Sequence, residues 1–194
     1  ALNAYGSSNL SATEATDVMV TAVREGKLEA SELAQSMGRV LPLASAMGVE
    51  FHEVGAAFAA LSRTGTNAAE ASTQVRGILA ALLKPTQQAE EALFKMGLSS
   101  AELRTQLKEK GLLSTLETLK KEFEGNDEAA AQVFGNVRAL SGVLDLMGAN
   151  ADGTRQIFDA LTNSLNATGE AFNVVEESVS QKLDKSIAQL SNDT

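Results

Sequence analysis

Residues 51–61 read FHEVGAAFAAL, and their large apolar side chains recur at the spacing of an α-helix. Phe51, Val54, Phe58 and Leu61 are three or four positions apart, so a helix would place them on one face. Strands would instead alternate apolar and polar residues, and the sequence sustains no such alternation for more than a few residues. We therefore predict an all-α fold.

The same spacing recurs along the rest of the chain. Further stripes are formed by Leu112, Leu116, Leu119 and Phe123; by Val137, Leu140, Leu144 and Met147; and by Phe158, Leu161 and Leu165. Apolar stretches are followed by glycines, which favour the left-handed conformation just beyond a helix C-terminus. These glycines are Gly26, Gly48, Gly65, Gly97, Gly111, Gly125, Gly148 and Gly169. The pattern predicts a compact bundle of short helices and helical hairpins joined by glycine-containing turns.

Capping residues and prolines indicate where helices begin and end. Three pairs place a capping side chain three residues before a glutamate: Ser11 with Glu14, Asn67 with Glu70, and Ser99 with Glu102. Pro42 predicts a break near Val40 or Leu41, and Pro85 ends the helix that starts near Asn67, so that Thr86 caps the next helix.

Alanine is densest between residues 56 and 81, at Ala56, Ala57, Ala59, Ala60, Ala68, Ala69, Ala71, Ala80 and Ala81. Small side chains let helix axes approach to the short end of the usual range of about 8–10 Å. Few large side chains then anchor the core, because aromatic residues make up only 4% of the chain. We expect modest stability per residue.

A last apolar stripe predicts a longer C-terminal helix. It consists of Phe172, Val175, Val179, Leu183, Ile187 and Leu190. These residues average about 3.6 positions per step, the period of one straight helix rather than of a strict heptad seam. The stripe is the candidate surface for self-association or for a partner. Packing back onto the chain's own core is the open alternative.

Composition excludes several classes of function. The 194 residues include 25 Asp and Glu against 16 Lys and Arg, and this net charge of -9 argues against direct nucleic-acid binding. Lys108, Lys110, Lys120 and Lys121 alternate with glutamates, as on a solvated helix face. The longest apolar run, residues 78–83, is far shorter than the roughly 20 residues that a membrane-spanning helix needs.

The sequence also lacks the residues of common catalytic and metal sites. There is no cysteine, and the single histidine, His52, begins a motif like that of zinc protease helices but without the second histidine. No carboxylate pair or glycine-rich loop marks a substrate or nucleotide site. We predict no catalytic, cofactor-binding or metal-binding residue, no cofactor and no enzymatic activity. The chain opens at Ala1 without a methionine, from which we expect a fragment of a longer protein.

Several segments resemble, in order and spacing, the conserved core of phage tail tape measure proteins. They are residues 23–27 (VREGK), 32–44 (ELAQSMGRVLPLA), 48–51 (GVEF), 68–71 (AAEA), 76–79 (RGIL), 84–85 (KP), 97–98 (GL) and 134–141 (FGNVRALS). The resemblance assigns residues 1–150 to the helical tape-measure core region. It leaves residues 151–194 as C-terminal helices that lead to a rod-like continuation.

The resemblance implies a structural virion protein of a phage or prophage, involved in tail assembly, tail length determination and genome delivery. It would lie in the lumen of the tail tube, and in the host cytoplasm during assembly. Expected partners are the tail tube protein, tail assembly chaperones, tail-tip proteins and further copies of itself. The residues alone leave two alternatives: a non-viral helical adaptor module and, less favoured, a cell-wall-cleaving enzyme domain.

Overall fold

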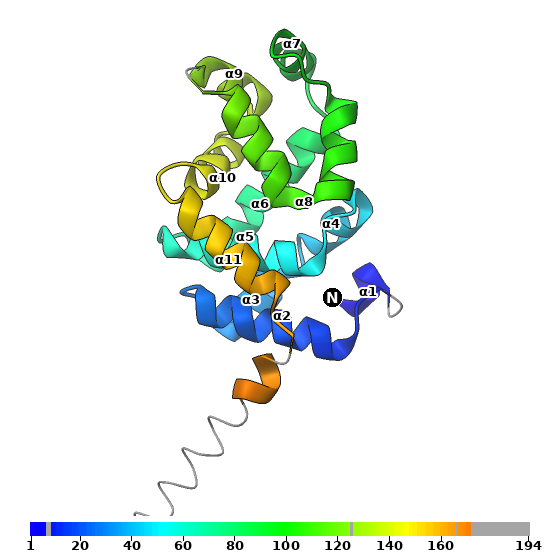
Figure 1. The fold of residues 1–194 in the computed structure, drawn as a ribbon, viewed down its shortest axis with the longest axis vertical. Helices are drawn as coiled ribbons and strands as arrows, with labels where there is room; N and C mark the ends of the chain where they lie inside the picture. The colour runs from blue at the N-terminus through cyan, green and yellow to red at the C-terminus, as the bar shows by residue number, and fades with distance from the viewer. Residues whose placement is uncertain (7–8, 125, 166, 172–194) are drawn as a thin grey trace, which may run out of the picture.

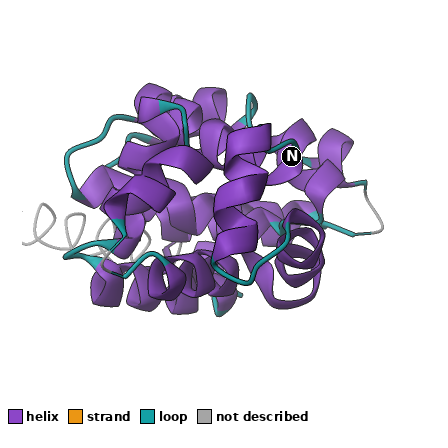
Figure 2. Cartoon of the chain, turned by 90° about the horizontal axis from the view of Figure 1, so that it is seen from above, coloured by secondary structure: helices purple, strands orange, loops and turns teal. Residues whose placement is uncertain are grey.

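In the computed structural model the chain is described at residues 1–6, 9–124, 126–165 and 167–171, and these residues form helices and connecting loops without strands (Figure 2). The helices are α1 (Leu2–Tyr5), α2 (Ala12–Glu25), α3 (Ala30–Met37), α4 (Leu41–Met47), α5 (Phe51–Arg63), α6 (Ala68–Leu83), α7 (Gln87–Lys95), α8 (Ser100–Glu122), α9 (Asp127–Val133), α10 (Val137–Met147) and α11 (Ala151–Thr162). A further helical turn spans residues 167–171. The predicted all-α class is confirmed.

Helix α5 is the centre of the core. Eleven of its thirteen residues are buried, so neighbours cover it on every side rather than along one stripe. It packs against α2, α6 and α11. Small residues make this possible: a Cβ at Gly55 would lie only 2.9 Å from Cγ1 of Val18 on α2. The predicted stripe from Phe51 to Leu61 is buried in full.

Helices α6 and α10 form a second close pair, also through small residues. A Cβ at Gly77 would lie 3.0 Å from that of Ala139, and one at Gly142 would lie 2.9 Å from Cβ of Gln74. This pairing corrects the predicted α10 stripe: Val137 and Leu144 are 81% and 58% exposed, Leu140 is half-buried, and only Met147 is buried. The buried face carries Ala139, Gly142, Val143, Leu146 and Met147, and its small residues Ala139 and Gly142 lie where α10 approaches α6 most closely.

The predicted helix starts are confirmed. Ser11 with Glu14 and Ser99 with Glu102 form reciprocal capping boxes, and the Asn67 side chain accepts from the Glu70 N–H. Pro42 is the second residue of α4, after a break at residues 38–40, and Thr86 caps α7.

The glycines that end helices do so in two ways. Gly48, Gly65, Gly97 and Gly111 adopt positive φ, as predicted. Gly26 and Gly148 also follow helices, but with φ of -92° and -78°, so the left-handed prediction is wrong at these two positions. Gly169 lies within the helical turn 167–171, so the helix end predicted there is wrong, and Gly125 lies outside the described residues.

Two regions can be distinguished by position and packing. The body comprises residues 12–83 and 137–162, which hold α2–α6, α10 and α11. The lobe comprises residues 87–133, which hold α7–α9. In the sequence it is inserted between α6 and α10, two helices of the body that pack against each other. In Figure 1 α7 and α9 lie at one end of the molecule and α2 and α3 toward the other. Within the lobe, α7 packs mainly on α9, whereas α8 reaches α4, α5, α6 and α10.

Helix α8 is sharply bent at Gly111, where φ is 83° and ψ is 178°. The bend separates an arm at residues 100–110 from an arm at residues 112–122. Gln106 bridges the arms by donating to the Ser114 carbonyl, at 3.2 Å, and to the Thr118 hydroxyl, at 2.7 Å. The stop predicted at Gly111 is thus the vertex of a helical hairpin.

The last described helix, α11, packs against α5 and α2. Phe158 and Leu161 are buried there as predicted, but Leu165 lies beyond the end of α11 and is 72% exposed, so its place in that stripe is wrong. The predicted C-terminal helix with its stripe from Phe172 to Leu190 falls outside the described residues.

Candidate functional site

A buried carboxylate at the contact between body and lobe is the most distinctive polar feature of the described chain. Glu53, in the first turn of α5, is only 7% exposed. One of its oxygens accepts a hydrogen bond from the Leu112 N–H at 2.6 Å, and the other accepts from the Glu50 N–H at 3.1 Å. Leu112 begins the second arm of α8, so one carboxylate satisfies free N–H groups at two helix N-termini.

The bend of α8 is shaped to receive this carboxylate. Gly111 has a positive φ, which other residues rarely adopt, and a Cβ there would overlap the Glu53 carboxylate. The Gly111 carbonyl in turn accepts from the buried Thr115 hydroxyl at 2.8 Å. Only glycine therefore fits at the vertex, for conformational and for steric reasons.

The electrostatics of Glu53 are set by opposing effects. Burial raises its pKa above the ordinary value, while the N–H groups of Leu112 and Glu50 lower it and compensate only in part. The net effect is a carboxyl group that takes up a proton more readily than an exposed glutamate does. Perturbed carboxyl groups are common in active sites, but here both oxygens are engaged by backbone donors. The geometry is that of a structural cap.

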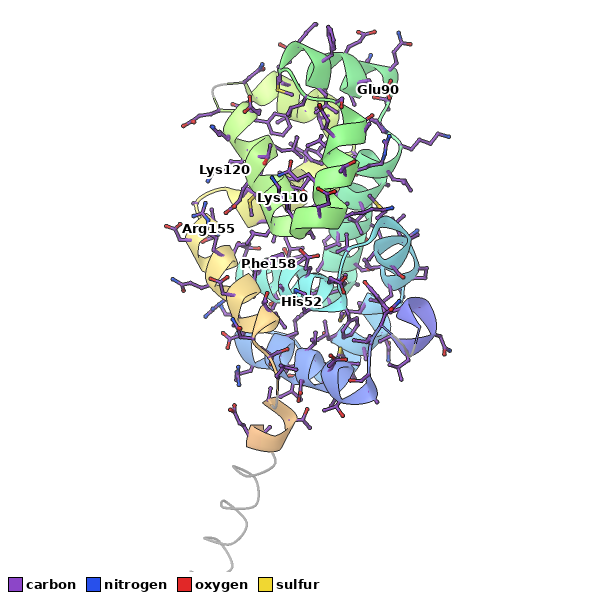
Figure 3. All side chains as sticks on the ribbon, turned by 45° about the vertical axis from the view of Figure 1, so that its right-hand side comes forward. His52, Glu90, Lys110, Lys120, Arg155 and Phe158 are labelled. Atoms are coloured by element: carbon purple, nitrogen blue, oxygen red, sulfur yellow. The ribbon has the colours of Figure 1, made fainter. Side chains whose placement is uncertain are left out.

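A cavity of about 470 Å³ opens beside this contact. Charged and titratable residues around it include Glu50, His52, Lys108, Lys110 and Asp159. Figure 3 shows Lys110 at the bend of α8, above His52 of α5 and near Phe158 of α11. The mixture of acidic and basic groups gives the cavity no single charge that would select an anion or a cation.

A second hollow, of about 440 Å³, lies between α8, α9, α10 and α11. Phe123, Ala130, Val143, Leu144 and Met147 contribute its apolar lining. Its rim carries both signs of charge. Arg155, on this rim, pairs with Glu117 of α8 and with Asp152 of its own helix, in pairs open to solvent that stabilise the fold little (Figure 3).

A second buried carboxylate anchors the end of the described chain. Asp17 of α2 is 2% exposed and accepts a hydrogen bond from the Thr168 N–H at 2.8 Å. Thr168 belongs to the helical turn 167–171. The last described residues are therefore attached to α2 of the body.

The residues that the sequence suggested as candidates for a functional site lie outside the described part of the chain, apart from His52. The stripe of Phe172, Val175, Val179, Leu183, Ile187 and Leu190 lies outside the described residues. His52 is half-buried at the start of α5. Within the described ranges no group of three or more His, Asp or Glu side chains is arranged to hold a metal ion. Among the described helices, none is both long enough and apolar enough to cross a bilayer.

Sequence reasoning missed the role of Glu53. A signal was available, because Glu53 is the only acidic residue in the stretch 51–61, which is apolar apart from Glu53 and His52. A helix that is apolar on all sides is buried, so a carboxylate within it needs a partner. The partner, Leu112, is 59 positions away and offers only its backbone, which no sequence pattern identifies.

The sequence of this chain is similar to that of phage tail proteins. Residues 1–137 match the family described as phage-related minor tail protein. The chain is also 25% identical, over 187 residues, to a tape measure protein of Pneumococcus phage Dp-1. That alignment covers 95% of this chain but only 16% of the relative, so the chain spans about one sixth of the relative's length. No solved structure matches the chain.

Proposed function

The chain belongs to the phage-related minor tail protein family, and from this membership we propose that it is a compact helical module of a tape measure protein. Membership makes it a phage tail structural protein. The proposal adds its roles in tail assembly, tail length determination and genome delivery. The observation that carries the proposal is the similarity to a tape measure protein along 95% of this chain.

The fold indicates what such a module contributes to tail length. A helical ruler converts residues into length at about 1.5 Å per residue. The described helices instead fold back on one another around α5, and a compact chain of this size has a radius of gyration of about 16 Å. While folded, the module adds little length, so the ruler function belongs to rod-like segments elsewhere in the full protein.

The resemblance takes residues 1–150 as the compact core region and residues 151–194 as the lead into such a rod. Because α11 (Ala151–Thr162) packs against α5 and α2, we place it with the compact core, so the proposed lead into the rod begins after residue 162. The stripe from Phe172 to Leu190 is then the proposed surface for self-association in the tail. Small-angle scattering of the 194-residue chain tests this division: a maximum dimension close to that of one straight helix of the whole chain would contradict it.

The proposed location is the lumen of the tail tube, reached from the host cytoplasm during assembly. The proposed partners are the tail tube protein, tail assembly chaperones and tail-tip proteins. The negative net charge supports contacts with proteins rather than direct contacts with DNA. The module could also open its hairpins to fit within the tube, an arrangement that its alanine-rich core would allow.

The family points to a non-enzymatic role, and we propose that this module performs no reaction. Glu53, the buried carboxylate with the most distinctive environment, has both oxygens occupied by backbone N–H groups. An assay of cell-wall clearing by the purified chain should therefore show no activity above buffer. Clearing that is lost in a Glu53→Gln variant would contradict the proposal.

An in-frame deletion tests the function in a phage that encodes this chain. A straight helix of the 171 residues up to the end of the described part would be roughly 260 Å long. We expect the deletion to impair tail assembly and to shorten the surviving tails by far less than that length. Normal tails in normal number, or virions without peptides of this protein, would contradict a structural role in the tail. Shortening by the full helical length would show that the segment itself is an extended ruler.

A further inference from the structure

The attachment of the lobe to the body combines apolar contacts with one buried charge. Leu107, Leu112, Leu116 and Leu119 of α8 are buried in the common core. Two further polar contacts join α8 to the body at the surface: Arg104 donates to the Leu83 carbonyl, and Glu117 pairs with Arg155. Glu53 differs from these because its carboxylate is buried and spans α5 and the bend of α8.

We infer that Glu53 is a latch between the body and the lobe, and that its release lets the bend of α8 separate from α5 while the body stays folded. The inference follows from the geometry of this chain and does not rest on the proposed function. The Leu112 N–H, at the start of an arm, has no helical acceptor of its own, so loss of the carboxylate leaves it unsatisfied.

The latch is conditional on the protonation of Glu53. Burial raises the pKa of Glu53 in the latched form, whereas release would expose the carboxylate to water and return it to ordinary behaviour. The state with the higher pKa binds the proton more tightly, so acid favours the latched form. At neutral pH the buried charge instead favours release.

Other charged and titratable groups line the cavity beside Glu53 or interact with it electrostatically. They are Tyr5 of α1; Glu50 and His52 beside the start of α5; Lys108, Glu109, Lys110 and Glu117 of α8; and Asp159 of α11. A neutral isostere at position 53 separates its contribution from theirs. Glu53→Gln keeps an oxygen for the Leu112 N–H and removes the charge, so it imitates the protonated latch.

Distance measurements between spin labels test the latch, because a chain without cysteines accepts labels at chosen positions. Thr105→Cys on the exposed side of α8 with Glu32→Cys on α3 reports body-to-lobe separation. Glu32→Cys with Arg63→Cys, both exposed and both in the body, is the matched control pair.

In the chain with Glu53 intact, the labels at positions 105 and 32 report a long distance in molecules whose lobe has opened. We expect this open fraction to grow as pH rises from 4 to 8, while the distance between the control labels at positions 32 and 63 stays unchanged. Glu53→Ala should raise the open-to-closed ratio roughly tenfold or more at every pH, as loss of an acceptor for a buried N–H requires. Glu53→Gln should remain closed and independent of pH. Glu102→Ala removes an exposed capping carboxylate from the same helix and should leave the Thr105 distances unchanged.

Two outcomes would overturn the latch. One is a Thr105 distance distribution that does not change with pH in the chain with Glu53 intact, a result that needs no destabilised variant. The other is equal opening in Glu53→Ala and Glu102→Ala. Gly111→Ala disturbs the same contact from the α8 side and should also increase the open population. In a chain that already carries Glu53→Ala, the added effect of Gly111→Ala should be smaller, because the new methyl group then has no carboxylate to displace.

Discussion

The body and the lobe are both helical but are held together differently. In α5, at the centre of the body, eleven of thirteen residues are buried, whereas α7 in the lobe buries only Ala89, Ala92 and Leu93 of its nine residues. The body gains its burial from alanines and glycines that let helices approach on all sides. The lobe depends on a few large side chains and on the contact at Glu53. We therefore expect the two helical regions to differ in stability.

The largest effect is expected at the centre of the body. Phe58 is fully buried, and Phe58→Ala should lower the free energy of unfolding by about 3–5 kcal/mol, because it leaves a cavity among rigid neighbours. Denaturant titration followed by circular dichroism measures this loss. A decrease below about 1 kcal/mol would mean that α5 is not the centre of stability.

A neighbouring pair in α7 tests the lobe. Leu93 is 2% exposed and Phe94 is 82% exposed, so two adjacent large side chains have opposite environments. Leu93→Ala should destabilise the lobe by about 2–3 kcal/mol, and Phe94→Ala should change stability by less than about 0.5 kcal/mol. Hydrogen exchange of α7 and α9 amides measures both variants. Equal effects would contradict the orientation of α7.

The close pairing of α6 and α10 predicts a cost for added volume. Gly142→Val should destabilise the body by about 1–3 kcal/mol, since even a Cβ would lie 2.9 Å from that of Gln74. Gly153→Ala is the matched control, because nothing lies within 4 Å of a Cβ there and the residue is helical. The control should be neutral or stabilising by up to about 1 kcal/mol. Thermal unfolding of both variants decides whether close approach, rather than any glycine substitution, causes the loss.

The smallest effect is the pH dependence carried by Glu53. Its folded pKa lies above the ordinary value of 4.5, so the folded chain retains this proton after the unfolded chain has lost it. The contribution of Glu53 to stability is therefore greatest below pH 4.5 and falls as pH rises through the folded pKa. The difference in unfolding free energy between the parent chain and Glu53→Gln should follow this curve. If the parent chain instead became more stable relative to Glu53→Gln as pH rises, the folded pKa of Glu53 would lie below the ordinary value, contrary to this account.

Local sequence signals predict helices and their ends better than they predict which faces pack. Ser99 with Glu102 and Pro85 with Thr86 act within a few residues, so their consequences can be read directly. The α10 stripe was misassigned because leucines outrank Ala139 and Gly142 in hydrophobicity, whereas the partner helix α6 selects for small size.

The candidate site was less predictable than the fold. Glu53 could be recognised as an unusual charge in an apolar helix, but its partner Leu112 contributes only a backbone N–H from a distant part of the chain. The predicted stripe from Phe172 to Leu190 stays a prediction.

Hydrogen exchange of the intact 194-residue chain at neutral pH tests most directly whether body and lobe differ in how they are held. We predict that amides of α5, α6 and α10 exchange only through global unfolding. Amides of α7 and α9, with Leu112 at the bend, should exchange through a shared opening of lower free energy. Equal protection of body and lobe, matching the global unfolding free energy throughout, would contradict the account.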